Sequence, residues 1–356
     1  MPMLQPPEQT TLFRAGEGDY HTYRIPAAVV TTQGTLLAFC EGRRDNPDDA
    51  GDIDLLVRRS TDGGRSWSPA QVVATDRPHT VGNPCPVVDR ETGTIWLLLT
   101  HNLGHDTEAQ ILAQTSEGTR TVWVTHSTDD GRTWAPRVEI TAAVKAPDWT
   151  WYATGPGVGI QLRSGRLVVP CNHGVAVTGA WRSHVIYSDD HGATWQLGGV
   201  LEERTNECQV VELADGRLLL NMRSYHGEHC RAIATSADGG HTWSAVSFDR
   251  ALVEPVCQAS LLRLSEERTG GRNRLLFANP ASTERERMTV RLSYDEGQTW
   301  PVAGLLHAGP SAYSCLAVLR DGTLACLYER GQQHPYEEIA LARFSLAWLT
   351  GGTDRL

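Results

Sequence analysis

Four aspartates fall close together near the N-terminus, at positions 45, 48, 49 and 52. Carboxylates that crowd together raise one another's pKa, because ionising one disfavours ionising its neighbours. A carboxyl group that stays protonated near neutral pH can act as a general acid. An Asp-rich stretch is also typical of a turn and, less often, of a calcium site, so the residue types alone leave three interpretations open.

Two other groups of reactive side chains favour structural interpretations. The segment His226-Gly-Glu-His229-Cys230 has the composition of a metal site, but a loop that holds unrelated histidines is the simpler interpretation. The chain has eight cysteines and no Cys-x-x-Cys pair, and most of them lie in apolar stretches, which predicts free buried thiols.

The overall composition excludes several functions. A net charge of −10 and a pI near 5.7 argue against a nucleic-acid partner, and an anionic substrate would need a local basic pocket. No apolar run approaches the roughly 18 residues needed to span a membrane. Residues 1–11 lack the basic start and apolar core of a signal peptide. We therefore expect a cytoplasmic protein, unless a secretion signal has been removed, and we expect a monomer.

A short repeated pattern, Ser-x-Asp-x-Gly-x-Thr/Ser-Trp, indicates the elements that must position any reactive groups. Its five copies occupy residues 60–67, 127–134, 188–195, 236–243 and 293–300, and each follows an apolar run with a period of two. Asp and Gly favour a tight turn, because the Asp side chain bonds nearby backbone N–H groups and Gly tolerates positive φ. The Trp can bury its ring against the sheet. The pattern therefore predicts repeated β-hairpins.

A second repeat, a glycine that opens an apolar strand, supports this architecture. It occurs at Gly34, Gly93, Gly165, Gly216 and Gly322. About six strand-turn-strand units fit between residues 12 and 350, which predicts an all-β, six-bladed β-propeller with very little helix. We expect an N-terminal extension over 1–11, one domain over 12–350 and a tail over 351–356. The final strand, 338–349, should join the first blade and close the ring.

The repeats resemble the Asp boxes of sialidases, and Tyr23-Arg24-Ile25-Pro26 matches that family's [FY]-R-I-P motif. The resemblance covers nearly the whole chain. It implies a retaining exo-α-sialidase, or neuraminidase, that hydrolyses terminal α-linked sialic acids from glycoconjugates or oligosaccharides through a covalent tyrosyl-glycoside. This chemistry requires no cofactor and no metal.

The resemblance also implies a clamp of three arginines for the substrate carboxylate. Arg24 is the first, and Arg223, in Asn221-Met-Arg-Ser, is the second. Arg285 is preferred over Arg287 as the third, because its eight-residue spacing to Ser293 fits the family pattern better. A guanidinium is a planar, permanently charged fork that can pair with a carboxylate through two hydrogen bonds.

The family's nucleophile is a tyrosine, which Tyr313 matches in Ser311-Ala-Tyr-Ser. Glu207, in Asn206-Glu-Cys-Gln, matches the residue that takes the tyrosine proton. A neutral phenol avoids the repulsion that an anionic nucleophile would meet beside the sugar carboxylate. With a pKa near 10, however, the phenol needs such a base.

The general acid/base of the family matches Asp49, nine residues before Arg58, with Asp48 as the alternative. Glu329, in Leu327-Tyr-Glu-Arg, resembles the carboxylate that orients the first arginine. Glu41 and Arg43 match further pocket positions. We also expect the pocket wall on the glycerol or aglycone side of the sugar to be formed by Trp149, Trp151 and Tyr152.

Two alternatives remain from the sequence. A trans-sialidase, or a hydrolase for deaminated or otherwise modified nonulosonic acids, would use the same catalytic set. A catalytically inactive sialic-acid-binding propeller would be favoured by loss of the tyrosine, its glutamate or the acid, and all three have candidates here.

Overall fold

A computed structural model describes residues 5–356, so residues 1–4 of the expected N-terminal extension lie outside it. The described chain forms 24 strands and four short helical segments. The helical segments are α1 (Glu108–Leu112), α2 (Thr141–Val144), the 3-10 helix η1 (Glu267–Thr269) and α3 (Leu346–Leu349). The prediction of an all-β fold with very little helix is confirmed.

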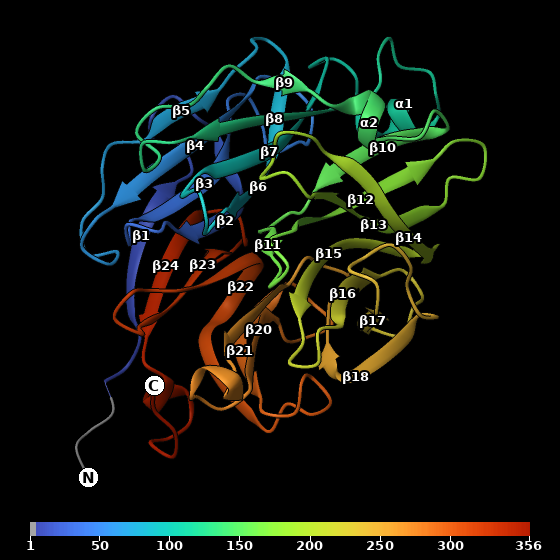
Figure 1. Cartoon of the computed structure of the whole chain (residues 1–356). Coiled ribbons are helices and arrows are strands. Elements are labelled where there is room, and N and C mark those ends of the chain that lie inside the picture. Colours follow the sequence, from blue (N-terminus) through green and yellow to red (C-terminus); the bar gives the residue numbers. More distant parts are fainter. Residues whose placement is uncertain (1–4) are drawn as a thin grey trace.

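Hydrogen bonding divides the strands into four sheets, which surround a common centre (Figure 1). The largest sheet contains β2 (Thr22–Val30), β3 (Leu36–Arg43), β4 (Ile53–Ser60), β5 (Gln71–Ala74), β6 (Thr80–Val88), β7 (Ile95–Asn102), β8 (Thr121–Ser127) and β9 (Val138–Glu139). The next contains β10 (Trp149–Thr154), β11 (Ile160–Gln161), β12 (Leu167–Val175), β13 (Trp181–Ser188) and β14 (Gln196–Glu203).

The other two sheets complete the circle. One contains β15 (Thr205–Glu212), β16 (Leu218–Ser224), β17 (Cys230–Ser236) and β18 (Ser247–Val253). The other contains β19 (Ser260–Ser265), β20 (Arg274–Pro280), β21 (Glu286–Ser293), β22 (Val302–Val318), β23 (Leu324–Arg330), β24 (Glu338–Phe344) and β1 (Glu8–Arg14).

The strands nearest the centre are buried on both faces because neighbouring groups of strands cover them. In β2 and β6 every residue but the last is buried. Hydrophobic clusters fill the space between successive groups of strands, as where Leu37 and Phe39 of β3 share a cluster with Leu97 and Leu99 of β7. All eight cysteines are buried and free, as predicted.

The five Asp boxes form the turns into β5, β9, β14, β18 and β22, so the hairpin prediction is confirmed. In every box the Ser hydroxyl donates to one Asp oxygen at 2.8 Å and the Thr or Ser hydroxyl donates to the other at 2.6 Å. The box Ser also accepts a hydrogen bond from the backbone N–H of the box glycine, four residues later, as between Gly131 and Ser127 at 2.9 Å. Each Asp therefore holds its turn through hydroxyl and backbone donors.

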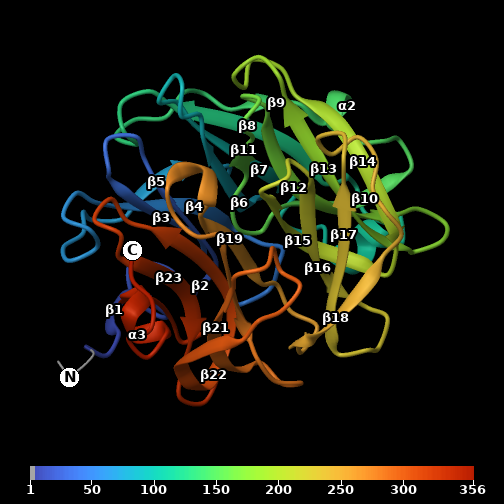
Figure 2. The ribbon, with the colours of Figure 1, turned by 60° about the horizontal axis from the view of Figure 1, so that its bottom comes forward.

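The two ends of the chain meet in one sheet. Strand β1 pairs antiparallel with β24, from Glu8 opposite Arg343 to Arg14 opposite Glu338. Strand β1 thus begins within segment 1–11, and α3, which is labelled near β1 in Figure 2, packs against β22. The expected strand over 338–349 is too long, because it ends at Phe344 and Ser345 caps α3 by accepting from the Trp348 N–H at 3.0 Å.

Over residues 5–356, none of the helices has the length and apolar character that a membrane span requires.

Candidate active site

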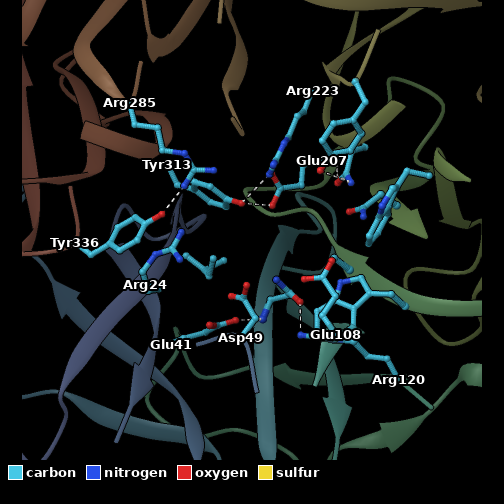
Figure 3. Close-up of a pocket in the computed structure, with 18 residues that line it drawn as sticks. Arg24, Glu41, Asp49, Glu108, Arg120, Glu207, Arg223, Arg285, Tyr313 and Tyr336 are labelled. Atoms are coloured by element: carbon cyan, nitrogen blue, oxygen red, sulfur yellow. Dashed lines mark hydrogen bonds and ion pairs between the residues drawn. The ribbon is translucent and has the colours of Figure 1, made fainter. Parts of the chain in front are cut away.

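A polar cavity of about 230 Å³ is formed by side chains from all four sheets (Figure 3). Four arginines and four carboxylates line it, together with tyrosines, tryptophans and asparagines. The cavity lies at the ends of the strands that are remote from the Asp boxes. In the β3–β4 pair, Leu36 lies opposite Ser60 of the first box, whereas Arg43 lies opposite Ile53, close to the Asp49 loop.

Local irregularities in the inner strands aim side chains into this cavity. Strand register shifts between Arg24 and Ala27 in β2, Gly82 and Cys85 in β6, Trp149 and Tyr152 in β10, Thr205 and Cys208 in β15, and Ser311 and Ser314 in β22. Within these five irregularities lie the cavity residues Ile25, Asn83, Trp151, Glu207 and Tyr313. A bulge bends its strand and re-aims a side chain, which is why bulges occur beside active sites.

One buried carboxylate fixes two of these irregular segments. Glu329, on β23, accepts hydrogen bonds from the backbone N–H groups of Ile25 at 2.9 Å and Tyr313 at 3.0 Å. It also accepts from Arg24 Nε at 2.8 Å. Ile25 has a φ of +61°, an unfavourable conformation for a β-branched residue that the bond to Glu329 helps to hold. Glu329 therefore lies where the resemblance implied, next to the first arginine.

The three predicted clamp arginines line the same cavity (Figure 3). Arg24 comes from β2, Arg223 from the end of β16, and Arg285 from the residue before β21. Arg223 Nη1 pairs with Glu207 Oε2 at 2.9 Å, and Arg285 donates to the Tyr336 hydroxyl. Arg287 is exposed and does not line the cavity, which supports the choice of Arg285.

Tyr313 and Glu207 are brought together from positions 106 residues apart (Figure 3). The buried Tyr313 hydroxyl donates a hydrogen bond to Glu207 Oε1. Burial, and then the negative charge of Glu207, raise the pKa of Tyr313 well above its usual value, while Arg223 and Arg285 lower it. The phenol is therefore neutral at physiological pH and has a carboxylate placed to receive its proton.

Asp49 lies on the loop between β3 and β4 and projects into the cavity with its side chain half-exposed. Its Oδ1 accepts from Arg43 Nη2 at 2.7 Å, and Arg43 also pairs with Glu41 at 2.6 Å. Glu41 lines the cavity, whereas Arg43 lies buried behind it. Asp48 is exposed and does not line the cavity.

The expected reason for a protonated Asp49 is wrong for this structure. Although burial raises its pKa, the charges of Arg43 and Arg24 and the hydrogen bond from Arg43 lower it to about 2. The neighbouring aspartate at position 52 instead pairs with Arg77 at 2.9 Å, outside the cavity. Arginines, and not crowded carboxylates, set the charge of Asp49.

A group of residues on the wall that faces the arginine clamp was not predicted from the sequence. Arg120, which precedes β8, stacks over the Trp151 ring at 3.8 Å and donates to Asn83 Oδ1 at 2.6 Å. Burial lowers the pKa of Arg120 to about 10, so it remains charged at neutral pH. Glu108, on α1, also lines this wall, and burial followed by the charge of Asp49 raises its pKa.

Tyr336 was also missed, and it lies beside the clamp. Its ring is 3.8 Å from the Arg24 guanidinium, and its hydroxyl accepts from Arg285. It falls in the polar segment 331–337, which has no periodicity to mark it. The one available signal for Asn83 is its Gly-Asn-Pro context inside a strand, which is typical of a bulge.

The predicted aromatic wall is only partly correct. Trp151 lines the cavity, but Trp149 and Tyr152 do not. Trp149 stacks on His173 with ring centroids 3.4 Å apart, and Tyr152 is fully buried and hydrogen-bonded to His184. The irregularity in β10 turns Trp151 toward the cavity and its two aromatic neighbours into the core.

No cluster of three or more His, Cys, Asp or Glu side chains that could hold a metal ion occurs in the part of the chain that the structure describes.

Comparison with known proteins gives consistent relatives. A family profile described as "BNR repeat-like domain" matches residues 34–326. A sialidase of Micromonospora viridifaciens is 39% identical over 97% of this chain, which spans only 54% of that protein, about half its length. An exo-alpha-sialidase of Arthroderma benhamiae is 33% identical over 94% of this chain and 86% of its own length.

Among solved structures, the Hadza microbial sialidase Hz136 superposes with a TM-score of 0.89 at 34% identity. The superposition covers 96% of this chain and 69% of that chain.

Proposed function

Because this chain belongs to the sialidase family, we propose that it is a retaining exo-α-sialidase, a glycoside hydrolase that removes terminal α-linked sialic acids from glycoconjugates. The observation that carries the proposal is the Tyr313 hydroxyl donating to Glu207 within a cavity lined by Arg24, Arg223 and Arg285. A buried tyrosine with its own base, surrounded by permanent cations, suits attack on a sugar that carries a carboxylate at the reacting carbon.

The first step forms a covalent intermediate. Glu207 takes the phenolic proton as the Tyr313 oxygen attacks the anomeric carbon, and Asp49 protonates the leaving glycosidic oxygen. In the second step Asp49 removes a proton from water, the water oxygen attacks the same carbon, and Tyr313 leaves with the proton returned from Glu207. Two successive inversions retain the anomeric configuration.

The arginines bind the substrate carboxylate and prepare the oxocarbenium-like transition state. Arg24 is held by Glu329 and Arg223 by Glu207, which leaves further guanidinium N–H groups for the ligand. Arg223 Nε is buried without a hydrogen-bond partner among the described residues, so a carboxylate oxygen would satisfy a donor that is otherwise unpaired.

Substrate binding must protonate Asp49, whose pKa is lowered to about 2 by Arg43 and Arg24. A bound sugar brings a negative carboxylate that offsets the charge of Arg24, and it displaces water from around Asp49. Both changes disfavour the ionised carboxylate and raise its pKa. We therefore assign the general acid/base role to Asp49 in the complex.

The wall formed by Arg120, Trp151 and Asn83 faces the clamp and would meet the C5 substituent. In a six-membered sugar ring, C5 lies across from C2, the carbon that bears the carboxylate. Arg120 and Asn172 both line this cavity, and Arg120 Nη1 and Asn172 Oδ1 are buried without hydrogen-bond partners among the described residues. A free donor and a free acceptor suit an amide, which favours an N-acylated sugar over a deaminated one.

The four sheets are consistent with six propeller blades, which we also propose. Strand β22 spans 17 residues and pairs with β21 along its first part and β23 along its second. Strands β4 and β6 share only the pair Ile53 and Thr80. Dividing the two large sheets at these points leaves six groups of strands, in one catalytic domain that includes β1.

The large apolar side chains exposed over residues 5–356 are few and scattered along the sequence, which supports a monomer.

The test is release of 4-methylumbelliferone from its α-glycosides of N-acetylneuraminic acid and of the deaminated sugar. We expect turnover of the first, with proton NMR showing the α-anomer of the free sugar as the initial product. Turnover of the deaminated conjugate alone would change the substrate and keep the mechanism. A folded protein that binds the sugar and cleaves neither conjugate would contradict the enzymatic proposal.

A further inference from the structure

The chain contains a single lysine, Lys145, against 31 arginines. Apart from the histidines, every other basic residue is therefore an arginine, including each cation that lines the cavity. An ammonium group differs from a guanidinium in being compact and in carrying three tetrahedral donors, whereas a guanidinium is a planar fork. A lone lysine in such a chain indicates a site whose shape suits a compact ammonium.

The three donors of Lys145 are directed at three oxygens. Lys145 follows α2, and its Nζ donates to Thr119 Oγ1 at 2.8 Å, the Arg120 carbonyl at 2.5 Å and the Thr150 carbonyl at 2.7 Å. These oxygens belong to two segments that are some thirty residues apart in the sequence. The ammonium thus joins the segment before β8 to the start of β10.

Both joined segments continue directly into the cavity wall. The residue whose carbonyl Lys145 binds on the first segment is Arg120 itself, and on the second segment Trp151 follows Thr150. Arg120 and Trp151 form the stacked pair on the wall that faces the clamp, with the guanidinium carbon 3.8 Å from the ring centroid. Lys145 therefore holds the backbone beneath both members of the pair.

The surroundings of Lys145 give it no electrostatic support. No carboxylate among residues 5–356 lies within ion-pair distance of it, and the charged side chain that acts on it most is the cation Arg120. Burial, and then the charge of Arg120, lower the pKa of Lys145 to about 7. A buried amine with so little support for its charge is typical of a functional site, where a specific set of hydrogen bonds must be made.

Packing does not replace these hydrogen bonds. A second cavity, of about 330 Å³, adjoins Lys145 and is lined in part by Thr119 and Thr150. The backbone that carries Arg120 and Trp151 therefore faces open space on this side. The two segments are joined there by the three hydrogen bonds of the lysine and by the Thr119 hydroxyl, which donates to the Thr150 carbonyl at 3.2 Å.

We infer that Lys145 is a positioning residue that holds Arg120 and Trp151 in register and so sets the affinity for the C5 substituent of the sugar. Lys145 is not among the residues that line the substrate cavity, so it acts only through those two side chains. The inference rests on the proposed function for its kinetic readout.

The test compares Lys145→Met with wild type on the N-acetylated and deaminated 4-methylumbelliferyl substrates. Misplacing a binding group by about 1 Å can cost up to about a hundredfold, and we expect KM for the N-acetylated substrate to rise about tenfold. Because the reacting groups are untouched, kcat should stay within about twofold. The value of kcat/KM for the N-acetylated substrate, divided by the value for the deaminated substrate, should fall. General destabilisation of the protein would not change this ratio.

Thr119→Val is the matched control, because it removes one acceptor of Lys145 and the hydrogen bond from Thr119 to Thr150, but leaves both bonds from the ammonium to backbone carbonyls. Its KM should rise by less than that of Lys145→Met. A folded Lys145→Met enzyme with wild-type KM and a wild-type substrate ratio would overturn the inference.

Reductive methylation keeps the inference testable if Lys145→Met does not fold. Dimethylation preserves the charge of Lys145 and removes two of its three donors, and the N-terminal amine is the other reactive amine. Methylated wild type should show the rise in KM, whereas methylation of a Lys145→Arg variant should add no change. Modified Lys145, verified by peptide mass spectrometry, with an unchanged KM would refute the inference.

Failure of the proposed function would be recognised separately, since wild type would then cleave neither substrate. In that case a crystal structure of Lys145→Met decides. Displaced Arg120 and Trp151 side chains would support the positioning role, and unchanged positions would refute it.

Discussion

At the scale of single residues, the cavity keeps the proposed nucleophile neutral and the proposed general acid ionised. Tyr313 has its pKa raised by burial and by Glu207, so it is a phenol that reacts only as its proton leaves. Asp49 has its pKa held down mainly by Arg43 and Arg24. In the proposed mechanism, the negative carboxylate of the substrate raises the pKa of Asp49 and so favours its protonated form.

Replacing Tyr313 with Phe removes the nucleophile and leaves the ring that packs beside Arg24. We expect kcat to fall by at least about a thousandfold, as for loss of a nucleophile from a catalytic set, while the Kd for a sialic acid analogue changes little. Steady-state kinetics and calorimetric titration check the two quantities. Full activity in this variant would remove Tyr313 from the mechanism.

Replacing Asp49 with Asn removes the proton donor for the leaving group. A positioned acid contributes about 10² to 10⁴ in rate, and we expect a loss of that size on a sialyl-lactose with an alcohol leaving group. The loss should be much smaller on the 4-methylumbelliferyl glycoside, because that phenolate leaves without protonation. Equal losses on both substrates would contradict the acid role, and Asp48→Asn, at the exposed neighbour, is the matched control.

At the scale of elements, two devices act at opposite ends of the strands. Irregular pairing at one end turns residues such as Glu207 and Tyr313 into the cavity. Asp boxes at the other end hold the turns, and the pKa of every box aspartate is lowered by the hydrogen bonds that it accepts, although burial opposes this most strongly in Asp295. Stability and chemistry are thereby kept in different parts of each hairpin.

The box aspartates predict acid sensitivity of the fold. A carboxyl group whose pKa is lower in the folded state stabilises the protein above its unfolded pKa, near 3.9, and this contribution is lost as pH falls through the folded value. For Asp129, whose pKa is about 2, the loss falls between about pH 4 and pH 2.

The variant Asp129→Ala tests this expectation. Asp129 accepts hydrogen bonds from the side chains of Ser127 and Thr133 and from backbone N–H groups of the turn. We expect the free energy of unfolding at pH 7 to fall by about 1–3 kcal/mol, as for lost hydrogen bonds to a charged group. Urea unfolding from pH 7 to pH 2 should show the difference from wild type shrinking toward low pH, and a constant difference would contradict it.

At the scale of the whole molecule, strands from the two ends of the chain pair in one sheet. Strand β1 completes the sheet of β22 to β24, so the N-terminal residues support the C-terminal sheet that carries Tyr313 and Glu329. The pairing of β1 with β24 leaves no unpaired edge at β24, and it connects the stability of this sheet to the cavity.

Deleting residues 1–14 removes β1 and exposes the edge of β24. We expect the midpoint of thermal unfolding to fall by roughly 5 °C or more, since loss of a few kcal/mol moves Tm by several degrees in a protein of this size. Activity should fall with it, because Tyr313 lies in the same sheet. Calorimetry and 4-methylumbelliferone release check both effects. Deleting only residues 1–4 is the control, and equal Tm values for the two deletions would contradict the role of β1.

The sequence by itself determined the all-β architecture, because alternating apolar residues and Asp-Gly turns are local signals that each hairpin carries. It also located Tyr313, Glu207, Asp49 and the three arginines, all of which line the cavity, because each lies in a short motif that a linear pattern can match. Only the tertiary structure decided the cavity wall that includes Arg120 and Glu108, the division between Trp151 and its neighbours, and the charge of Asp49. These depend on strand irregularities and on cations contributed by distant strands, and both exist only once the sheets have packed together.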